Sequence, residues 1–156
     1  MKVGFYAGSF DPFTIGHLHI VKSASQMFDR VIVGMGVNVS KGRRYDKEAM
    51  IQAMMETFRQ EGLDNVECVI YDGLTYDVAL ANGATVLIRG IRNGMDYDYE
   101  ENLAQINYEL GGLDTVYLRA GEYGMVSSSM VYELIKREKD ASKYLPAEIL
   151  NLVKGE

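Results

Sequence analysis

The stretch YAGSFDPFTIGHLHIV, from Tyr6 to Val21, decides the fold because it predicts a strand, a turn and a helix in succession. The run KVGFYA (residues 2–7) is almost continuously apolar, which is typical of a parallel strand buried on both faces. From His17 onward the apolar residues follow the helical period. The turn between them concentrates residues that bend the backbone or form hydrogen bonds: Gly8, Ser9, Asp11, Pro12, Thr14, Gly16 and His17.

The rest of the chain repeats this alternation of apolar runs and helical periods. Further strands are predicted at residues 30–37, 66–71, 85–90 and 115–120. Helices are predicted at residues 17–28, 46–61, 76–82, 96–110, 128–137 and 146–153. We therefore expect an α/β fold, a doubly wound, Rossmann-like, parallel five-stranded sheet with helices on both faces. No repeat or linker divides the chain, so residues 1–156 are expected to form a single domain.

Four of the predicted helices carry an apolar stripe of the kind that packs on a core. In residues 17–28 the stripe includes Met27, and in residues 46–61 it includes Met55. In residues 96–110 the stripe consists of Tyr99, Leu103, Ile106 and Leu110. In residues 128–137 the stripe consists of Met130, Val131, Leu134 and Ile135.

Composition narrows the class of protein. The chain has 156 residues, is 47% apolar and carries a net charge of −6 without a sustained basic segment, which argues against nucleic acid as its partner. No apolar run approaches the roughly 20 residues of a membrane helix, and the first residues do not resemble a secretory signal. The single Cys68 lies in an apolar strand, where a packed thiol is expected rather than a nucleophile. Together these features favour a cytoplasmic location.

The turn in the opening stretch is a candidate anion site. In doubly wound sheets, ligands bind beyond the carboxyl ends of the strands, where the strand order reverses. The free amides at the start of the following helix suit a phosphate. His17 shares the sheet-facing side of that helix, whereas His19 lies about 200° further round and is expected to face solvent. His17 taken alone could equally be a core histidine with a satisfied hydrogen bond.

Three further segments carry candidate anion-binding groups. Arg89 and Arg92 lie at the end of a predicted strand and could bind phosphate, or could pair with the acidic residues that follow; we favour the ligand. Ser127 to Ser129 open a helix, where one serine is expected as the N-cap. Lys41 follows the second strand and, on these grounds alone, is a solvated loop residue.

Other kinds of site are not indicated. The two histidines and one cysteine do not form a metal-binding pattern, and no nucleophile elbow is present. Several anion-binding features at one edge, without an evident nucleophile or base, suggest phosphoryl or nucleotidyl transfer. Such chemistry can depend on positioning and charge stabilisation alone.

The motifs resemble those of the phosphopantetheine adenylyltransferases, in the nucleotidyltransferase superfamily marked by a histidine-x-glycine-histidine motif. That motif is represented here by Thr14-Ile15-Gly16-His17, and its threonine is typical of this family rather than of the nicotinamide-mononucleotide enzymes. GSFDPFTIGH, TVLIRGIRNGMDYDYE and VSSSM follow in the family's order and spacing over the whole chain. Ile15 departs from the usual asparagine, and Ser9 replaces a common threonine.

The resemblance implies transfer of the adenylyl group of ATP to 4′-phosphopantetheine, giving 3′-dephospho-coenzyme A and pyrophosphate, with Mg²⁺. It implies catalytic roles for His17 and Lys41. The substrate-binding positions it implies are Ser9, Lys41, Thr75 and Arg89. The ATP-binding positions it implies are Ser9, Phe10, His17, Gly90, Ile91, Arg92, Glu100, Tyr123, Gly124, Met125, Val126, Ser127, Ser128 and Ser129. It also implies a homohexamer. Whether coenzyme A, as an end product, is a feedback ligand of the site stays open at this point.

Two alternatives stay open at this point. One is a nucleotidyltransferase that acts on a different phosphate or mononucleotide, which Thr14 and the RGIRNGMDYDYE segment disfavour. The other is a nucleotide-binding module without catalytic activity, which the presence of His17, Lys41 and Arg92 together disfavours.

Overall fold

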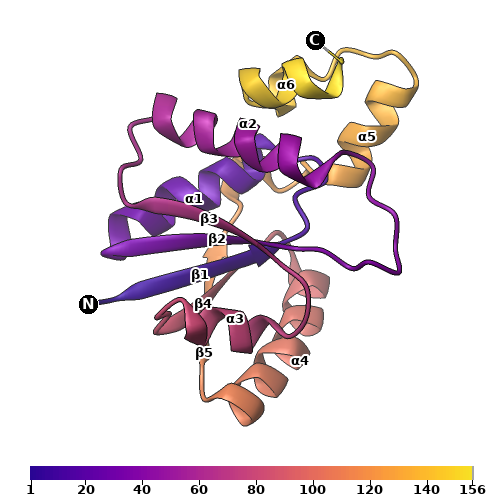
Figure 1. Ribbon diagram of the computed structural model, residues 1–156. Helices are drawn as coiled ribbons and strands as arrows, with labels where there is room; N and C mark the ends of the chain where they lie inside the picture. The colour runs from indigo at the N-terminus through magenta and orange to yellow at the C-terminus, as the bar shows by residue number, and fades with distance from the viewer. Residues whose placement is uncertain (156) are drawn as a thin grey trace.

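The computed structural model describes residues 1–155, and its centre is one sheet of five parallel strands in the order β3-β2-β1-β4-β5 (Figure 1). The strands are β1 (Val3–Gly8), β2 (Arg30–Gly36), β3 (Val66–Tyr71), β4 (Val86–Ile91) and β5 (Asp114–Arg119). The predicted fold class is confirmed, and each strand boundary lies within one residue of its expected place.

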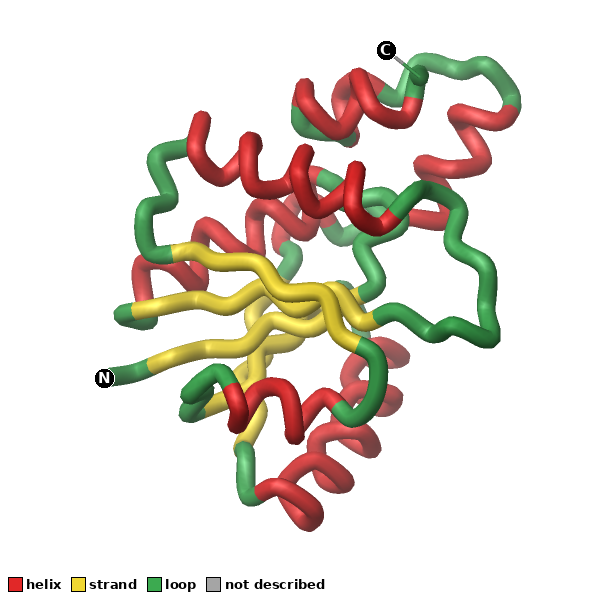
Figure 2. Tube along the Cα trace, viewed as in Figure 1, coloured by secondary structure: helices red, strands yellow, loops and turns green. Residues whose placement is uncertain are grey.

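Helices cover both faces of the sheet (Figure 1). They are α1 (Ile15–Met27), α2 (Lys47–Gln60), α3 (Thr75–Ala81), α4 (Gly94–Gly111), α5 (Ser128–Lys136) and α6 (Ala147–Val153). Short 3-10 turns lie at Gly121–Tyr123 and Ser142–Tyr144. Helices α1 and α2 lie on one face with α6 against α2, and α3 and α4 lie on the other (Figures 1 and 2).

The strand order reverses at the centre of the sheet. β1 pairs with β2 through Val3↔Arg30 to Gly8↔Met35, and with β4 through Gly4↔Val86 to Tyr6↔Ile88. The chain leaves β1 for α1 and leaves β4 for α4, so both exits meet at one edge. In a doubly wound sheet this is the expected place for a ligand.

The start of α1 explains the shape of the turn before it. Thr14 is the N-cap, and the hydroxyl of Thr14 accepts from the His17 backbone N–H while the His17 ring accepts from the Thr14 backbone N–H. The helix therefore begins at Ile15 rather than at the expected His17, and His17 lies in its first turn. The imidazole performs the reciprocal capping that Glu or Gln performs in other helices.

The core has two parts of unequal size. The larger fills the space between the sheet and α1, α2, α5 and α6, and includes Phe13, Met54 and Ile149, all fully buried. The smaller lies under α3 and includes Phe5, Ala79 and Leu87. Cys68 packs against the larger cluster, as expected, and burial raises the pKa of its thiol to about 12.

Some side chains of the predicted apolar stripes are exposed in the single chain. On α4, Tyr99, Ile106 and Leu110 are 64%, 51% and 60% exposed, and Leu103 is also exposed, so the expectation of a core-facing stripe is wrong there. The reason is that α4 lies at the end of the sheet, against α3, β4 and the edge strand β5, with part of its apolar side uncovered. Met27 and Met55 are exposed for the simpler reason that each lies at the margin of its stripe. Within residues 1–155, no helix combines the length and the apolar content needed to cross a membrane.

Candidate functional site

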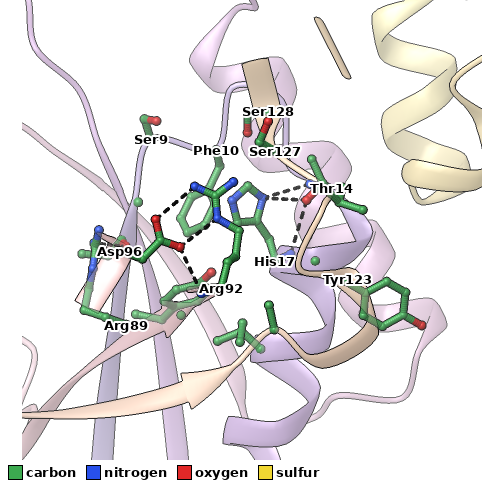
Figure 3. Close-up of a pocket in the computed structure, with 18 of the residues that line it drawn as sticks. Ser9, Phe10, Thr14, His17, Arg89, Arg92, Asp96, Tyr123, Ser127 and Ser128 are labelled. Atoms are coloured by element: carbon green, nitrogen blue, oxygen red, sulfur yellow. Dashed lines mark hydrogen bonds and ion pairs between the residues drawn. The ribbon is translucent and has the colours of Figure 1, made fainter. Parts of the chain in front are cut away.

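A cavity of about 260 Å³ opens where the strand order reverses (Figure 3). Its walls come from β1, the turn, α1, β4, the first turns of α4 and the segment before α5. The predicted site residues that line it are Ser9, Phe10, His17, Arg89, Gly90, Arg92, Glu100, Tyr123, Val126, Ser127 and Ser128. Residues up to 119 positions apart in sequence, Ser9 and Ser128, are therefore brought together as the motifs predict.

The tautomer of His17 follows from one hydrogen bond. The backbone N–H of Thr14 donates to Nδ1 of His17 over 3.0 Å, and because an amide can only donate, Nδ1 carries no proton. The ring proton is therefore on Nε2, which has no hydrogen-bond partner among the described residues. Phe10 and Phe13 hold the ring, with centroids 5.0 and 5.4 Å away. His17 thus presents a fixed N–H donor on the cavity wall (Figure 3).

The charge of His17 is also determined by its surroundings. Burial, followed by the positive charges of Arg89 and Arg92, lowers the pKa of His17 to about 4. The imidazole is therefore neutral at neutral pH and donates a hydrogen bond without carrying a charge.

Each of the two predicted arginines has an acidic partner. Arg89 donates to Glu100 through Nε and Nη2 over 2.6 and 2.8 Å, and its Nη1 donates to the Ala7 carbonyl. Arg92 donates to Asp96 through Nε and Nη2 over 2.9 and 3.2 Å (Figure 3). Both guanidinium groups therefore do pair with acidic residues, because α4 places Asp96 and Glu100 opposite β4. Ligand binding by Arg89 and Arg92 in addition to this pairing stays a prediction.

These ion pairs also shift the pKa values of Arg89 and Asp96. Although burial disfavours a charged Arg89, the hydrogen bonds and charge of Glu100 raise the pKa of its guanidinium. The hydrogen bond from Arg92 lowers the pKa of Asp96. The cavity therefore keeps two guanidinium groups that are held by carboxylates and whose remaining N–H donors are available to a ligand.

The three serines at the start of α5 have three different contacts. Ser127 is the N-cap, as predicted, and its Oγ accepts from the Met130 backbone N–H over 3.1 Å. The hydroxyl of Ser128 donates to the Pro12 carbonyl over 2.7 Å and so joins α5 to the turn. Ser129 is outside the cavity lining, where its Oγ accepts from Arg44 over 3.1 Å.

Several predicted residues do not line this cavity. Lys41 lies on an exposed loop, Met125 is 88% exposed, and Ile91 and Gly124 lie beside the lining residues rather than among them. His19 does not simply face solvent, because its ring packs against Tyr123 with centroids 5.2 Å apart. That contact was missed because the segment that brings Tyr123 to α1 lies about a hundred residues further along the chain.

A second cavity, of about 240 Å³, adjoins the first and shares Ala7, Arg89 and Glu100 with it. Thr75 lines this second cavity and not the first. The remaining walls are largely apolar and come from the start of α3, from β4 and from α4: Leu74, Leu87, Leu103, Ile106 and Leu110. The arrangement therefore joins a polar, cationic cavity to an apolar one through an ion pair.

Sequence reasoning missed three residues beside the site. Asp11, Arg43 and Arg44 connect the turn after β1 to the loop after β2 through several hydrogen bonds. Asp11 was counted only as a turn residue. The one available signal was the pair of adjacent arginines two residues after Lys41, opposite an aspartate in the turn.

Comparison with known proteins identifies the family to which the chain belongs. Residues 5–134 match the family described as cytidylyltransferase-like. The chain is 38% identical to phosphopantetheine adenylyltransferase of Oenococcus oeni, over 99% of this chain and 98% of that one. It is 40% identical to phosphopantetheine adenylyltransferase of Porphyromonas gingivalis, over 93% and 94% of the two chains.

Solved structures show the same fold at lower sequence similarity. Nicotinic acid mononucleotide adenylyltransferase of Plasmodium falciparum, complexed with NaAD, is similar with a TM-score of 0.70 and 14% identity over 99% of this chain and 98% of that one. A bifunctional NMN adenylyltransferase/ADP ribose pyrophosphatase of Francisella tularensis has a TM-score of 0.68 and 15% identity, over 98% of this chain and 52% of that one.

Proposed function

Since the chain belongs to the cytidylyltransferase-like family and, within it, to the phosphopantetheine adenylyltransferases, we propose that its two joined cavities transfer the adenylyl group of ATP to 4′-phosphopantetheine. The products are 3′-dephospho-coenzyme A and pyrophosphate. The observation that carries the proposal is the neutral His17 with its proton fixed on Nε2, at the wall of a cavity that also holds Arg89 and Arg92.

The two cavities suit the two substrates. ATP occupies the polar cavity, where the start of α1, the guanidinium groups and the serine hydroxyls favour phosphates. The pantetheine arm occupies the apolar cavity beside Thr75, and its phosphate reaches past the shared wall to Ser9 in the polar cavity. Coenzyme A carries the same arm, so it competes for the apolar cavity and can act there as a feedback ligand.

The reaction is an in-line displacement. An oxygen of the acceptor phosphate attacks the α-phosphorus of ATP, the bond from that phosphorus to the β-phosphate oxygen breaks, and pyrophosphate leaves with the electron pair. The Nε2–H of His17 donates to an oxygen of the five-coordinate phosphorus, and Lys41 adds a positive charge there. No general base is required, because the attacking phosphate is already ionised near neutral pH.

Mg²⁺ enters as part of the nucleotide substrate. Among residues 1–155, no group of three or more metal-binding side chains is present, and the cavity carboxylates Asp96 and Glu100 are paired with arginines. The phosphates of ATP are therefore its main ligands, and the ion offsets part of their charge.

The test is pyrophosphate release from ATP by His17→Ala, with His19→Ala as the matched control. Loss of one transition-state donor is expected to lower kcat by about 100- to 1000-fold while the KM for ATP changes little. Wild-type protein should release pyrophosphate with 4′-phosphopantetheine and not with nicotinamide mononucleotide. Near-normal kcat in His17→Ala would remove His17 from the mechanism, and release without either acceptor would contradict the proposed transfer.

We also propose that the exposed side of α4 joins copies of this chain into a homohexamer. The support is the apolar surface that α4 leaves uncovered in one chain, including Tyr99 and Ile106. Tyr99 lies outside both cavities, so Tyr99→Asp is expected to reduce the sedimenting mass without altering them. Met27→Asp, an equally apolar and exposed position on α1, is the control. An unchanged mass in Tyr99→Asp would place the interface elsewhere.

A further inference from the structure

Asp11 attaches one loop to another beside the site. One carboxylate oxygen, Oδ2, accepts from the Arg44 backbone N–H over 2.8 Å, and Oδ1 accepts from the Tyr45 backbone N–H over 2.9 Å. The guanidinium of Arg43 lies 3.6 Å from Oδ1, and both side chains are only 15% exposed. A single carboxylate in the turn after β1 therefore holds three consecutive residues of the loop after β2.

The same two segments are joined in the opposite direction. Arg43 donates through Nη1 to the Ser9 carbonyl over 2.6 Å and through Nη2 to the Phe10 carbonyl over 3.2 Å. Arg44 donates through Nη1 to the carbonyl of Asp11 over 3.0 Å. We call these contacts between residues 9–11 and 43–45 the clasp.

The clasp lies between two groups that the proposed mechanism needs at one phosphorus atom. On one side it holds the backbone of Ser9 and Phe10, and the Phe10 ring packs on His17. On the other side it holds Arg43, two residues after Lys41. At its start the loop is tied to β3, where the Val37 backbone N–H donates to the Tyr71 carbonyl over 2.8 Å. Between Val37 and the clasp its hydrogen bonds are local, from Ser40 and Lys41 to Asn38.

We infer that Asp11 is a positioning residue, which acts through the clasp to hold the Lys41 loop (residues 37–46) at the site. This inference rests on the proposed function, because it requires Lys41 to act on the reacting phosphate. Lys41 is exposed and lies outside the cavity lining, so its approach to a ligand depends on how the loop is attached. A displacement of about 1 Å at such a group can cost about 100-fold in rate.

The substitution Asp11→Asn probes the clasp with a minimal change in volume. Two N–H donors and a guanidinium face the Asp11 carboxylate, so an amide would lose one acceptor and turn its own NH₂ toward those donors. We expect kcat to fall by about tenfold to 100-fold, with a smaller change in the KM for ATP. The control is Asp140→Asn, which makes the same change in a carboxylate that accepts the Ser142 backbone N–H far from the cavity.

A double-mutant cycle with Lys41→Ala separates positioning from general stability. If Asp11 acts through Lys41, Asp11→Asn lowers kcat in the wild-type background and lowers it by less than about twofold in the Lys41→Ala background. Equal losses in both backgrounds would overturn the inference and leave Asp11 as a structural residue. If Lys41→Ala itself keeps normal kcat, the assignment of Lys41 in the proposed function fails, and the inference fails with it.

Trypsin provides a measurement that does not depend on activity. The clasp protects the peptide bonds after Arg43 and Arg44, so Asp11→Asn should be cut there several-fold faster than wild type, while Asp140→Asn should not. Unchanged cleavage would show that Asp11 does not hold the loop, whatever Lys41 does. Should Asp11→Asn fail to fold, Arg43→Met removes the Arg43 guanidinium contacts of the clasp from the loop side. It is tested in the same two assays, with trypsin cleavage followed after Arg44, since residue 43 is then no longer a trypsin site.

Discussion

The two faces of the sheet are both covered by amphipathic helices, but they differ in how completely the apolar side chains fill the space beneath them. Under α1 and α2, the apolar side chains form a core in which Phe13, Met50 and Met54 are almost completely enclosed. A cavity of about 400 Å³ on this side lies between the end of α2 and the edge strand β3, away from the nucleotide site. Under α3 and α4, the core is smaller, and a cavity of about 240 Å³ remains between Leu103, Ile106 and the strands. The first face therefore stabilises the chain, whereas the second leaves apolar surface available for binding.

One face of the sheet therefore holds a site residue in place, and the other borders the cavity proposed for a substrate. The filled face supports the ring of His17, since Phe13 packs on both His17 and Phe58 of α2. The open face ends in the Arg89–Glu100 pair, which forms the shared wall of the two cavities. His17, whose ring has to stay in place, thus rests on the packed core. The pantetheine arm proposed above meets the less packed face.

The largest expected effect is on the free energy of unfolding, when one apolar side chain is truncated on each face of the sheet. Met54→Ala should lower the free energy of unfolding by about 2–5 kcal/mol, because it leaves a cavity in a filled core. Leu103→Ala should lower it by less than about 1 kcal/mol, because that side chain is already 37% exposed beside a cavity. Denaturant unfolding of both variants measures the two values.

Both truncations are made in the Tyr99→Asp background, so that a second copy does not cover α4. Leu103→Ala should nevertheless raise the KM for 4′-phosphopantetheine, which Met54→Ala should not. Equal losses of stability at the two positions would mean that the two faces are packed alike, contrary to the comparison.

A smaller effect follows from the burial that the filled face imposes on His17. Its pKa is about 4 in the folded chain and 6.5 in the unfolded one, so the unfolded chain binds more protons between these values. The contribution is fully present above about pH 6.5 and is lost as the pH falls through about 4, a change of about 3 kcal/mol. Unfolding measured from pH 7 to 4.5 should show this loss in wild type and not in His17→Gln; identical profiles would contradict the low pKa.

The fold and the main site could be predicted because their signals are local. Strand, turn and helix follow one another in residues 3–27, and the strand order then brings the motifs to one edge. What could not be predicted depends on which side chains meet across long separations. Arg89 could pair with an acid or bind a ligand, and only the placement of α4 against β4 shows that Glu100 is its partner.

The stripe on α4 was misjudged for a related reason. Periodicity shows that one side of a helix is apolar, but not whether a core, a ligand or another chain covers it. Asp11 was overlooked because aspartate before proline is common in turns, and its partners lie more than thirty residues away in the loop after β2.

The smallest expected effect concerns how the face under α3 and α4 recognises its ligand. The hydroxyl of Thr115 on β5 is buried at the apolar cavity and is the one enclosed side-chain oxygen without a hydrogen-bond partner among the described residues. A polar group of the bound pantetheine arm would supply that partner. Thr115→Val should therefore raise the KM for 4′-phosphopantetheine by about fivefold, corresponding to a hydrogen bond of about 1 kcal/mol, and leave the KM for ATP unchanged. Because valine has a similar shape and removes an unpaired polar group, the variant should be at least as stable as wild type. Loss of stability without a change in either KM would instead mean that the hydroxyl serves the packing of the sheet, and that the open face recognises its ligand by apolar contact alone.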